Sequence, residues 1–534
     1  MSPLLILLVG VVVVIGLIIV LRVNAFIALI TAAIIVSLLA PGPAAEKMSR
    51  VATAFGSVVG SIGIVIALAA IIGTCLMESG AADRIVRAFL SVLGEKRAAW
   101  ALMGSGFVLS VPVFFDTVFY LLIPLARSLY QRTQKNYMLY IMAICAGGCI
   151  THTLVPPTPG PLFIAAAFKV DLGLMILVGA MIALPTSILA LLICKLINRG
   201  LNIPMRDYSG EPQPDPLADE QLPPLWLSLV PVLLPVVMIS AHTITSVIAE
   251  SEYVNIWNRF LVETRVVTDN EEAKSLAQDL VNAKLTTQPQ DSATMAQALV
   301  KAHIIADEAA AQKLTQNLLH AEVFTGVSAT PRPARSCANV TALLGNPNLA
   351  LLLSAIVAMS LLVWKRGISL RELADKIDKS LMSGGVIILI TAGGGAFGAM
   401  LRAAGIQGAI ENRFGAGGQH VGMMIFLAAF GVAAMLKFAQ GSSTVAMITT
   451  SSMFAAMGIT TEMLGCNHVY LATTIGAGAL VGSWMNDSGF WIVARMGVLT
   501  EAEALKSWTP LLATLGFAAF GFSLLFSRLL PLLP

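Results

Sequence analysis

The chain of 534 residues is 57% hydrophobic and only 12% charged, with a mean hydropathy of +0.83. A soluble domain carries roughly twice that share of charged residues, so the composition excludes a protein with one aqueous core and indicates a lipid bilayer as its solvent. The formal net charge is only +3 and no basic tract occurs, which argues against nucleic acid as a partner. The six cysteines lack paired metal-ligand spacing, so we expect neither a metal site nor a cofactor.

Apolar segments near the roughly 20 residues that cross a bilayer predict an all-α polytopic membrane protein. They cover residues 3–21, 25–40, 55–77, 98–115, 117–130, 137–154, 172–195, 224–246, 347–364, 382–400, 419–437, 443–458, 468–485 and 509–530. Four clusters of Lys and Arg, at residues 84–97, 127–135, 195–206 and 365–379, predict the cytoplasmic side. The chain between the first two clusters must therefore either cross twice or re-enter.

Residues 249–344 differ in being polar, with helical periodicity and more acids than bases. One span separates them from a cytoplasmic cluster on each side, which predicts a small helical insertion in the periplasm. The insertion divides a first membrane half, residues 1–248, from a second membrane half, residues 345–534.

The two halves share a pattern of interruptions. The first half contains "GFVLSVPVFFDTVFYLLIP" and then "AICAGGCITHTLVPPTPGPLFIA", whereas the second contains "MLKFAQGSSTVAMITTSSM" and then "TIGAGALVGSWMNDSGFWIVA". In each half a polar break is followed by a glycine-rich helix that ends in helix-breaking residues. Interrupted segments at corresponding positions of two halves indicate the binding site of a secondary transporter.

The break in the second half offers an element that can bind an anion. Gly441 permits a tight turn, and Ser442, Ser443 and Thr444 can cap the next helix or donate to a ligand. A helix N-terminus inside the protein carries partial positive charge, which suits an anion. The alternative is an ordinary serine-threonine cap inside a helical bundle.

The first half places two ionisable residues at its interruptions. Asp116 lies in an apolar segment with no base within ten residues, so it requires a partner, a proton or a functional pathway. An acid that reaches the membrane interface is the alternative. His152 precedes "TLVPPTPGP" and can shuttle a proton or donate to an anion, or it can be a satisfied structural histidine.

In the second half, Asn486, Asp487 and Ser488 hold the place that matches His152. An acid in each half provides a candidate proton site. Lys437 and Arg402 also lie beside apolar segments. For both we expect a side chain that extends to the membrane interface, and the alternative is that either neutralises an anionic substrate or pairs with an acid.

Several motifs resemble those of one transporter family. They are "GGGAFGAMLRAAGIQGAI", "AQGSSTVAMITT", "GSWMNDSGFWIVARMGVLTEAEALKSWT", "LSVPVFFDTVFYLLIPLA" and "THTLVPPTPGP". Together they resemble the gluconate permease family, GntP-type gluconate:proton symporters of the ion-transporter superfamily. The resemblance covers both membrane halves, from about the third span to the end.

The resemblance implies a carrier of the bacterial inner membrane that moves gluconate or a related sugar acid with protons. It also implies two inverted repeats, an elevator-type homodimer and re-entrant hairpins near residues 98–126 and 436–458. By position, the hairpins hold Pro112 to Thr117 and Gly441 to Thr444. The acid of the first hairpin is often glutamate in this family and is aspartate in this chain.

The helix interruptions and the resemblance together predict a site for a small anionic substrate. We expect the substrate to contact Thr117, His152, Gly441, Ser442, Ser443, Thr444, Asn486 and Ser488. The coupling proton is assigned to Asp116 or Asp487, with His152. Sodium coupling through unwound carbonyls is an alternative, and a membrane-embedded enzyme is another, although no nucleophile motif or metal-ligand set accompanies the acid and the histidine.

Overall fold

The computed structural model describes residues 2–21, 23–201, 203, 205–206, 219–267, 269–282, 285, 292–301, 304–305, 307–321, 323–324, 327, 333–406, 421–485 and 487–533. These residues form helices joined by turns, and no β-strand occurs among them. The chain divides into two compact units. The first contains Met1–Val237 and Pro347–Leu533 and holds most of the apolar helices, and the second contains Met238–Asn346.

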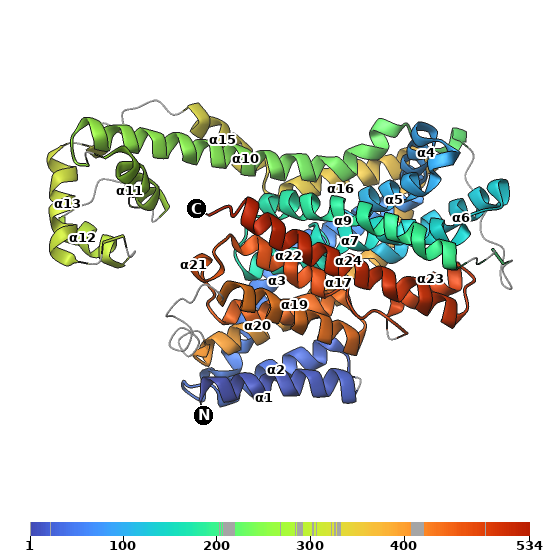
Figure 1. The fold of residues 1–534 in the computed structure, drawn as a ribbon, viewed down its shortest axis with the longest axis horizontal. Helices are drawn as coiled ribbons and strands as arrows, with labels where there is room; N and C mark the ends of the chain where they lie inside the picture. The colour runs from blue at the N-terminus through green and yellow to red at the C-terminus, as the bar shows by residue number, and fades with distance from the viewer. Residues whose placement is uncertain are drawn as a thin grey trace. The chain divides into compact units, whose positions relative to one another are not determined.

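The first unit is built from the two halves of the sequence. The first half forms α1 (Pro3–Ile15), a π-helix (Gly16–Val20), α2 (Ala25–Leu39), α3 (Glu46–Ser79), α4 (Ala81–Leu93), α5 (Ala98–Leu109), α6 (Phe115–Thr133), α7 (Tyr137–Leu154), α8 (Pro159–Ala167) and α9 (Leu172–Gly200). The second half forms α16 (Pro347–Arg366), α17 (Leu370–Ala403), α19 (Val421–Gln440), α20 (Ser443–Ala456), α21 (Thr461–Leu464), α22 (His468–Gly478), α23 (Ser488–Met496) and α24 (Glu501–Leu529). Neighbours in sequence such as α1 and α2 also pack side by side (Figure 1).

Helix breaks fall inside both predicted hairpins. Between α5 and α6 the chain passes through Pro112, which lacks the N–H that would continue a helix. Between α19 and α20 it turns at Gly441, whose φ of 80° lies in the left-handed region that glycine adopts without strain. Further breaks separate α7 from α8 at Val155–Thr158 and α22 from α23 at residues 479–487. The breaks therefore follow directly from proline and glycine in the sequence.

Helix α7 lies at the centre of the first unit. Together with α8 it forms the apolar segment Tyr137–Ala167, which contains an 18-residue stretch that is 94% buried inside the protein. A Cβ atom at Gly147 of α7 would lie 2.0 Å from the Met103 carbonyl oxygen of α5. In the second half, a Cβ atom at Gly478 of α22 would lie 2.4 Å from the Phe430 carbonyl oxygen of α19. Glycine thus lets α7 pack closely against the backbone of α5, and α22 against the backbone of α19.

Eight segments of the described chain are long and apolar enough to cross a membrane. They are Glu46–Ser79, Tyr137–Ala167, Leu172–Gly200, Leu225–Glu263, Pro347–Arg366, Leu370–Ala403, Val421–Ala439 and Glu501–Leu529. Helix α9 exposes Leu177, Leu184, Ile188, Leu192 and Leu196 along one side, as expected of a surface that faces lipid. The prediction of an all-helical polytopic membrane protein is confirmed.

The second unit has a core of its own. It contains the later part of α10 (Leu225–Glu263) together with α11 (Asn270–Asn282), α12 (Ser292–Lys301), α13 (Glu308–His320) and α15 (Pro333–Leu344). Trp257 is fully buried among Leu261, Leu280, Leu299 and other apolar residues, and its ring packs edge to face against Phe324 with centroids 5.3 Å apart. The unit begins before the predicted boundary at residue 249 because α10 continues from the apolar segment without a break.

Candidate functional site

The helix breaks of the two halves meet around one cavity of about 370 Å³. Small-molecule sites commonly have volumes of about 300–1,000 Å³. The polar residues that line the cavity come from both halves of the sequence: Asp116, Thr117, Cys149, His152, Thr153, Lys437, Ser442, Ser443, Thr444, Asp487, Ser488 and Trp508. The structure therefore brings together candidate residues that lie more than 300 positions apart in the sequence.

Asp116 and Thr117 form the contribution of the first break. Both lie in the first turn of α6, and both are half-buried in the wall of the cavity. Among the described residues, neither side chain has a hydrogen-bond or ion-pair partner. The charged groups that act on Asp116 are Asp487 and Lys437, both of which line the same cavity. The Asp116 carboxylate is thus positioned to interact with whatever occupies the cavity.

His152 lies in the last turn of α7 and also lines the cavity. Its ring packs edge to face against Phe114, with centroids 6.0 Å apart. Its Nδ1 atom is buried and has no hydrogen-bond partner in the described part of the chain. A buried polar atom without a partner is unfavourable, so a ligand that supplies the missing hydrogen bond would be stabilised here.

The second break presents the N-terminus of α20 to the cavity. Ser442 is the N-cap, and its Oγ accepts a hydrogen bond of 3.3 Å from the Val445 N–H. For Ser442, the capping role given above as an alternative is therefore the observed one. Ser443 and Thr444 open the helix and line the cavity, and their hydroxyls have no protein partner in the described residues. They remain available to a ligand at the positive end of the helix.

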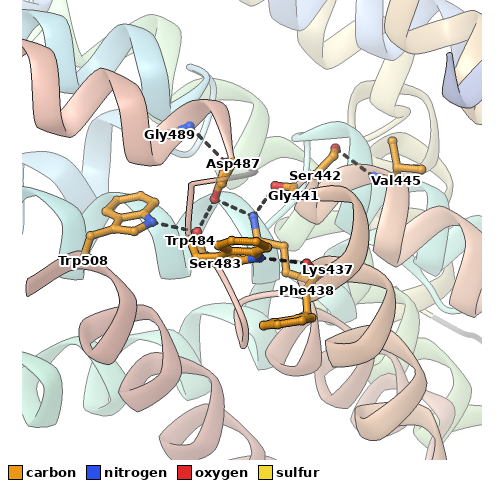
Figure 2. A network of polar contacts seen from close by, with 10 residues as sticks. All are labelled: Lys437, Phe438, Gly441, Ser442, Val445, Ser483, Trp484, Asp487, Gly489 and Trp508. Carbon is orange, nitrogen blue, oxygen red and sulfur yellow. Dashed lines mark hydrogen bonds and ion pairs between the residues drawn. The ribbon is translucent and has the colours of Figure 1, made fainter. Parts of the chain in front are cut away.

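A buried ion pair joins the two breaks of the second half (Figure 2). Lys437 Nζ lies 2.6 Å from Asp487 Oδ2, and the two side chains are only 2% and 10% exposed. The same ammonium donates to the Gly441 carbonyl oxygen at 2.6 Å, which satisfies an acceptor left open where α19 ends. Asp487 is the N-cap of α23, and its Oδ1 accepts from the Gly489 N–H at 3.0 Å. The pair fixes the end of α19 to the start of α23.

A tryptophan extends this network towards the first half. Ser483 donates to Asp487 Oδ2 and accepts a 2.7 Å hydrogen bond from Trp508 Nε1, as Figure 2 shows. The Trp508 ring lies against Phe115, with centroids 5.6 Å apart. Since Phe115 precedes Asp116 in the first turn of α6, the network connects the second-half ion pair with the acid of the first break.

Every predicted site residue that the structure describes lies in the wall of the cavity. Thr117, His152, Gly441, Ser442, Ser443, Thr444 and Ser488, with the two acids Asp116 and Asp487, all line the cavity. Asn486 lies outside the described residues. The expectation that Lys437 extends to the membrane interface is wrong, because its side chain is buried and paired, whereas Arg402 is exposed. Lys437 stands four residues before Gly441, and its ammonium donates to the Gly441 carbonyl oxygen at the end of α19. A lysine at this spacing before a helix-ending glycine is the signal in the sequence that favours the buried position.

Ser483 and Trp508 were not predicted from the sequence. Trp508 stands immediately before the predicted span 509–530, and its partner lies 25 residues away in the sequence. The hydrogen bond between them is formed only after the helices pack.

The arrangement suits a small organic anion that carries hydroxyl groups. It offers a buried ammonium, the positive end of α20, free hydroxyls and an unpaired imidazole nitrogen. In the part of the chain that the structure describes, no group of three or more His, Cys, Asp and Glu side chains is arranged to hold a metal ion.

Comparison with known proteins identifies the family. The family model described as GntP family permease matches residues 2–270 and 255–529. A gluconate permease of Pseudomonas aeruginosa is 27% identical over 515 residues, covering 95% of this chain and 94% of that protein. The inner membrane permease YgbN of Escherichia coli is 29% identical over 520 residues, covering 96% and 95%. An uncharacterized permease of Haemophilus influenzae is 36% identical over 245 residues, or 44% of this chain and half of that protein. The chain belongs to the GntP family of permeases.

Proposed function

We propose that the protein imports gluconate or a closely related sugar acid across the bacterial inner membrane by proton symport. The single observation that carries the proposal is the cavity in which the interrupted helices of both halves present a buried ammonium, free hydroxyls and acids. Membership in a permease family sets aside the alternative of a membrane-embedded enzyme. The gluconate permease among the relatives supports the choice of substrate class.

The substrate carboxylate is assigned to the N-terminus of α20. There the Ser443 and Thr444 hydroxyls and the helix dipole favour an anion, and the buried Lys437 adds positive charge to the same cavity. Thr117 and His152 face the same space and are assigned to the hydroxyl groups of the sugar acid. Asn486 and Ser488 stay in the proposal because of their positions in the sequence beside Asp487.

The coupling proton is assigned to Asp116 in preference to Asp487. Asp487 already has a counter-charge in Lys437 and accepts hydrogen bonds from the Ser483 hydroxyl and the Gly489 N–H. Asp116 has no such partners among the described residues. The cavity contains two carboxylates and one ammonium, so an entering monoanion adds to a negative excess. Binding of that anion therefore favours a proton on the acid that lacks compensation.

Sodium coupling has weaker support. It depended on unwound carbonyls near Gly441 and Asn486. Asn486 lies outside the described residues, and the Gly441 carbonyl already accepts from the Lys437 ammonium. A cation placed there would meet a fixed positive charge. We therefore assign the coupling to protons.

Inverted repeats and an elevator motion are part of the proposal. The packing of helices supports the repeats, because α3 packs against α16 while its counterpart α17 packs against α2, and α8 packs against α20 while α23 packs against α6. The similar triplets "DTV" at Asp116–Val118 and "STV" at Ser443–Val445 begin corresponding helices. In the proposed elevator motion, the helices of the two hairpins move with the bound substrate relative to α3 and α17. The proposed assembly is a dimer of two chains. The insertion lies in the periplasm.

Uptake by purified protein in proteoliposomes tests the function. We expect labelled gluconate to accumulate under an inward proton gradient, to stop accumulating with a protonophore, and to ignore an imposed sodium gradient. Uptake that follows sodium and persists with the protonophore would assign the coupling to sodium. No flux of gluconate or of a panel of related sugar acids under any gradient would reject the substrate class.

A further inference from the structure

A second cavity, of about 260 Å³, lies next to the candidate site. Phe114 and Thr117 line both cavities, so the two spaces share one wall. The second cavity is bounded by α3, by the break between α5 and α6, and by the N-terminal part of α17. We call it the lysine vestibule, after Lys376 and Lys379 in its wall.

The polar groups of the lysine vestibule join the two long helices α3 and α17. Lys376 of α17 forms an ion pair with Glu78 of α3, and Thr74 donates to Ser380 across the same interface at 3.1 Å. The Lys376 and Glu78 side chains are 34% and 36% exposed, and Lys379 is exposed. Both ammonium groups can therefore be reached from water.

We propose that the lysine vestibule is a transit site for the substrate carboxylate on the cytoplasmic side, with Lys376 as its cation. The proposal rests on the function proposed above. The helix ends around the vestibule carry the basic residues that predict the cytoplasmic face, and Arg366 of this group donates to the Glu78 carbonyl oxygen at 2.7 Å. An anion that passes Phe114 on its way from the central cavity next meets Lys376.

The partly exposed ion pair between Lys376 and Glu78 suits a site of transient binding better than a site of tight binding. Partly exposed ion pairs contribute little net stability, so a carboxylate from the substrate can replace Glu78 beside Lys376 at small cost. A site on a transport path must bind well enough to be entered and weakly enough to be left. Phe114 separates the two spaces, and its contact with the His152 ring places it at the edge of the central site.

The test compares gluconate kinetics from the two faces of the membrane. Inside-out vesicles present the cytoplasmic face, and right-side-out vesicles present the periplasmic face. The variant is Glu78→Gln combined with Lys376→Gln, which removes both charges and leaves neither unpaired. The control is Arg371→Gln, which removes one positive charge from an exposed position of the same helix outside the vestibule.

We expect the double variant to raise the KM for gluconate from the cytoplasmic face about three- to fivefold and to change the periplasmic KM by less than about twofold. Arg371→Gln should leave both values unchanged, and calorimetric binding of gluconate to the detergent-solubilised double variant should match the wild type. Equal KM values for wild type and double variant at the cytoplasmic face would overturn the vestibule alone. Absence of gluconate flux in wild-type vesicles would overturn the proposed function, and the vestibule with it.

Discussion

Replacement of Lys437 by Met should strongly destabilise the protein. The substitution leaves the Asp487 carboxylate, only 10% exposed, without its counter-charge and leaves the Gly441 carbonyl without its donor. Removing one partner of a buried ion pair costs about 3–5 kcal/mol. Asp487→Asn removes the ion-pair partner of the buried Lys437 ammonium, so we expect a loss of similar size.

The double variant K437M/D487N separates the ion pair from its two members. With both charges gone neither position holds an uncompensated charge, and the asparagine side chain introduced in place of Asp487 can still cap α23. The main remaining defect is the unpaired Gly441 carbonyl, so the double variant should lose about 1–3 kcal/mol. If the two sites were independent, the losses would add to about 6–10 kcal/mol.

Equilibrium unfolding in mixed micelles, with increasing SDS and tryptophan fluorescence as the signal, measures these four proteins. Trp508 and Trp484 both lie beside the network and should report its loss (Figure 2). We expect the double variant to be more stable than either single variant. A double variant whose loss equals the sum of the single losses would show that Lys437 and Asp487 do not interact, and would refute the reasoning.

Three further substitutions test separate parts of the account. Asp116→Asn should abolish proton-driven accumulation of gluconate in proteoliposomes while gluconate exchange continues; accumulation at the normal level would show that the proton binds elsewhere. His152→Leu removes the buried Nδ1, and calorimetry should show a loss of affinity for gluconate of about tenfold, whereas an unchanged affinity would exclude contact with the substrate. Gly147→Ala places a Cβ 2.0 Å from the Met103 carbonyl oxygen and should lower the yield of monodisperse protein in size-exclusion chromatography, whereas Gly56→Ala, with open space around it, should not. Equal yields of these two alanine variants would contradict the close packing of α5 and α7.

The interruptions were predictable because their causes are local. Pro112 and Gly441 break helices by their own backbone chemistry, and the polar residues beside them stand out in apolar segments. The polar insertion was visible in the same way from composition alone. Helix starts were less predictable: α24 begins at Glu501, eight residues before the expected span, because Thr500 and Glu503 form a capping box that a search for apolar segments does not detect.

Pairing of Lys437 with an acid was only an alternative at the level of the sequence, because the cause of the ion pair is not local. A lysine near an apolar segment usually extends to the interface, and nothing within one helix contradicts that for Lys437. Its partner Asp487 lies 50 residues later. Only the packing of α19 against α22 brings the two breaks together and buries both charges. The same packing is our reason for proposing Asp487 as a counter-ion and Asp116 as the proton carrier.

The most direct test of the central claim is a cryo-electron microscopy structure of the protein determined in saturating gluconate. The account predicts density for one gluconate in the cavity lined by Asp116, Ser443 and Asp487, with its carboxylate at the N-terminus of α20. Gluconate bound elsewhere with this cavity closed, or these three residues facing separate spaces, would contradict it.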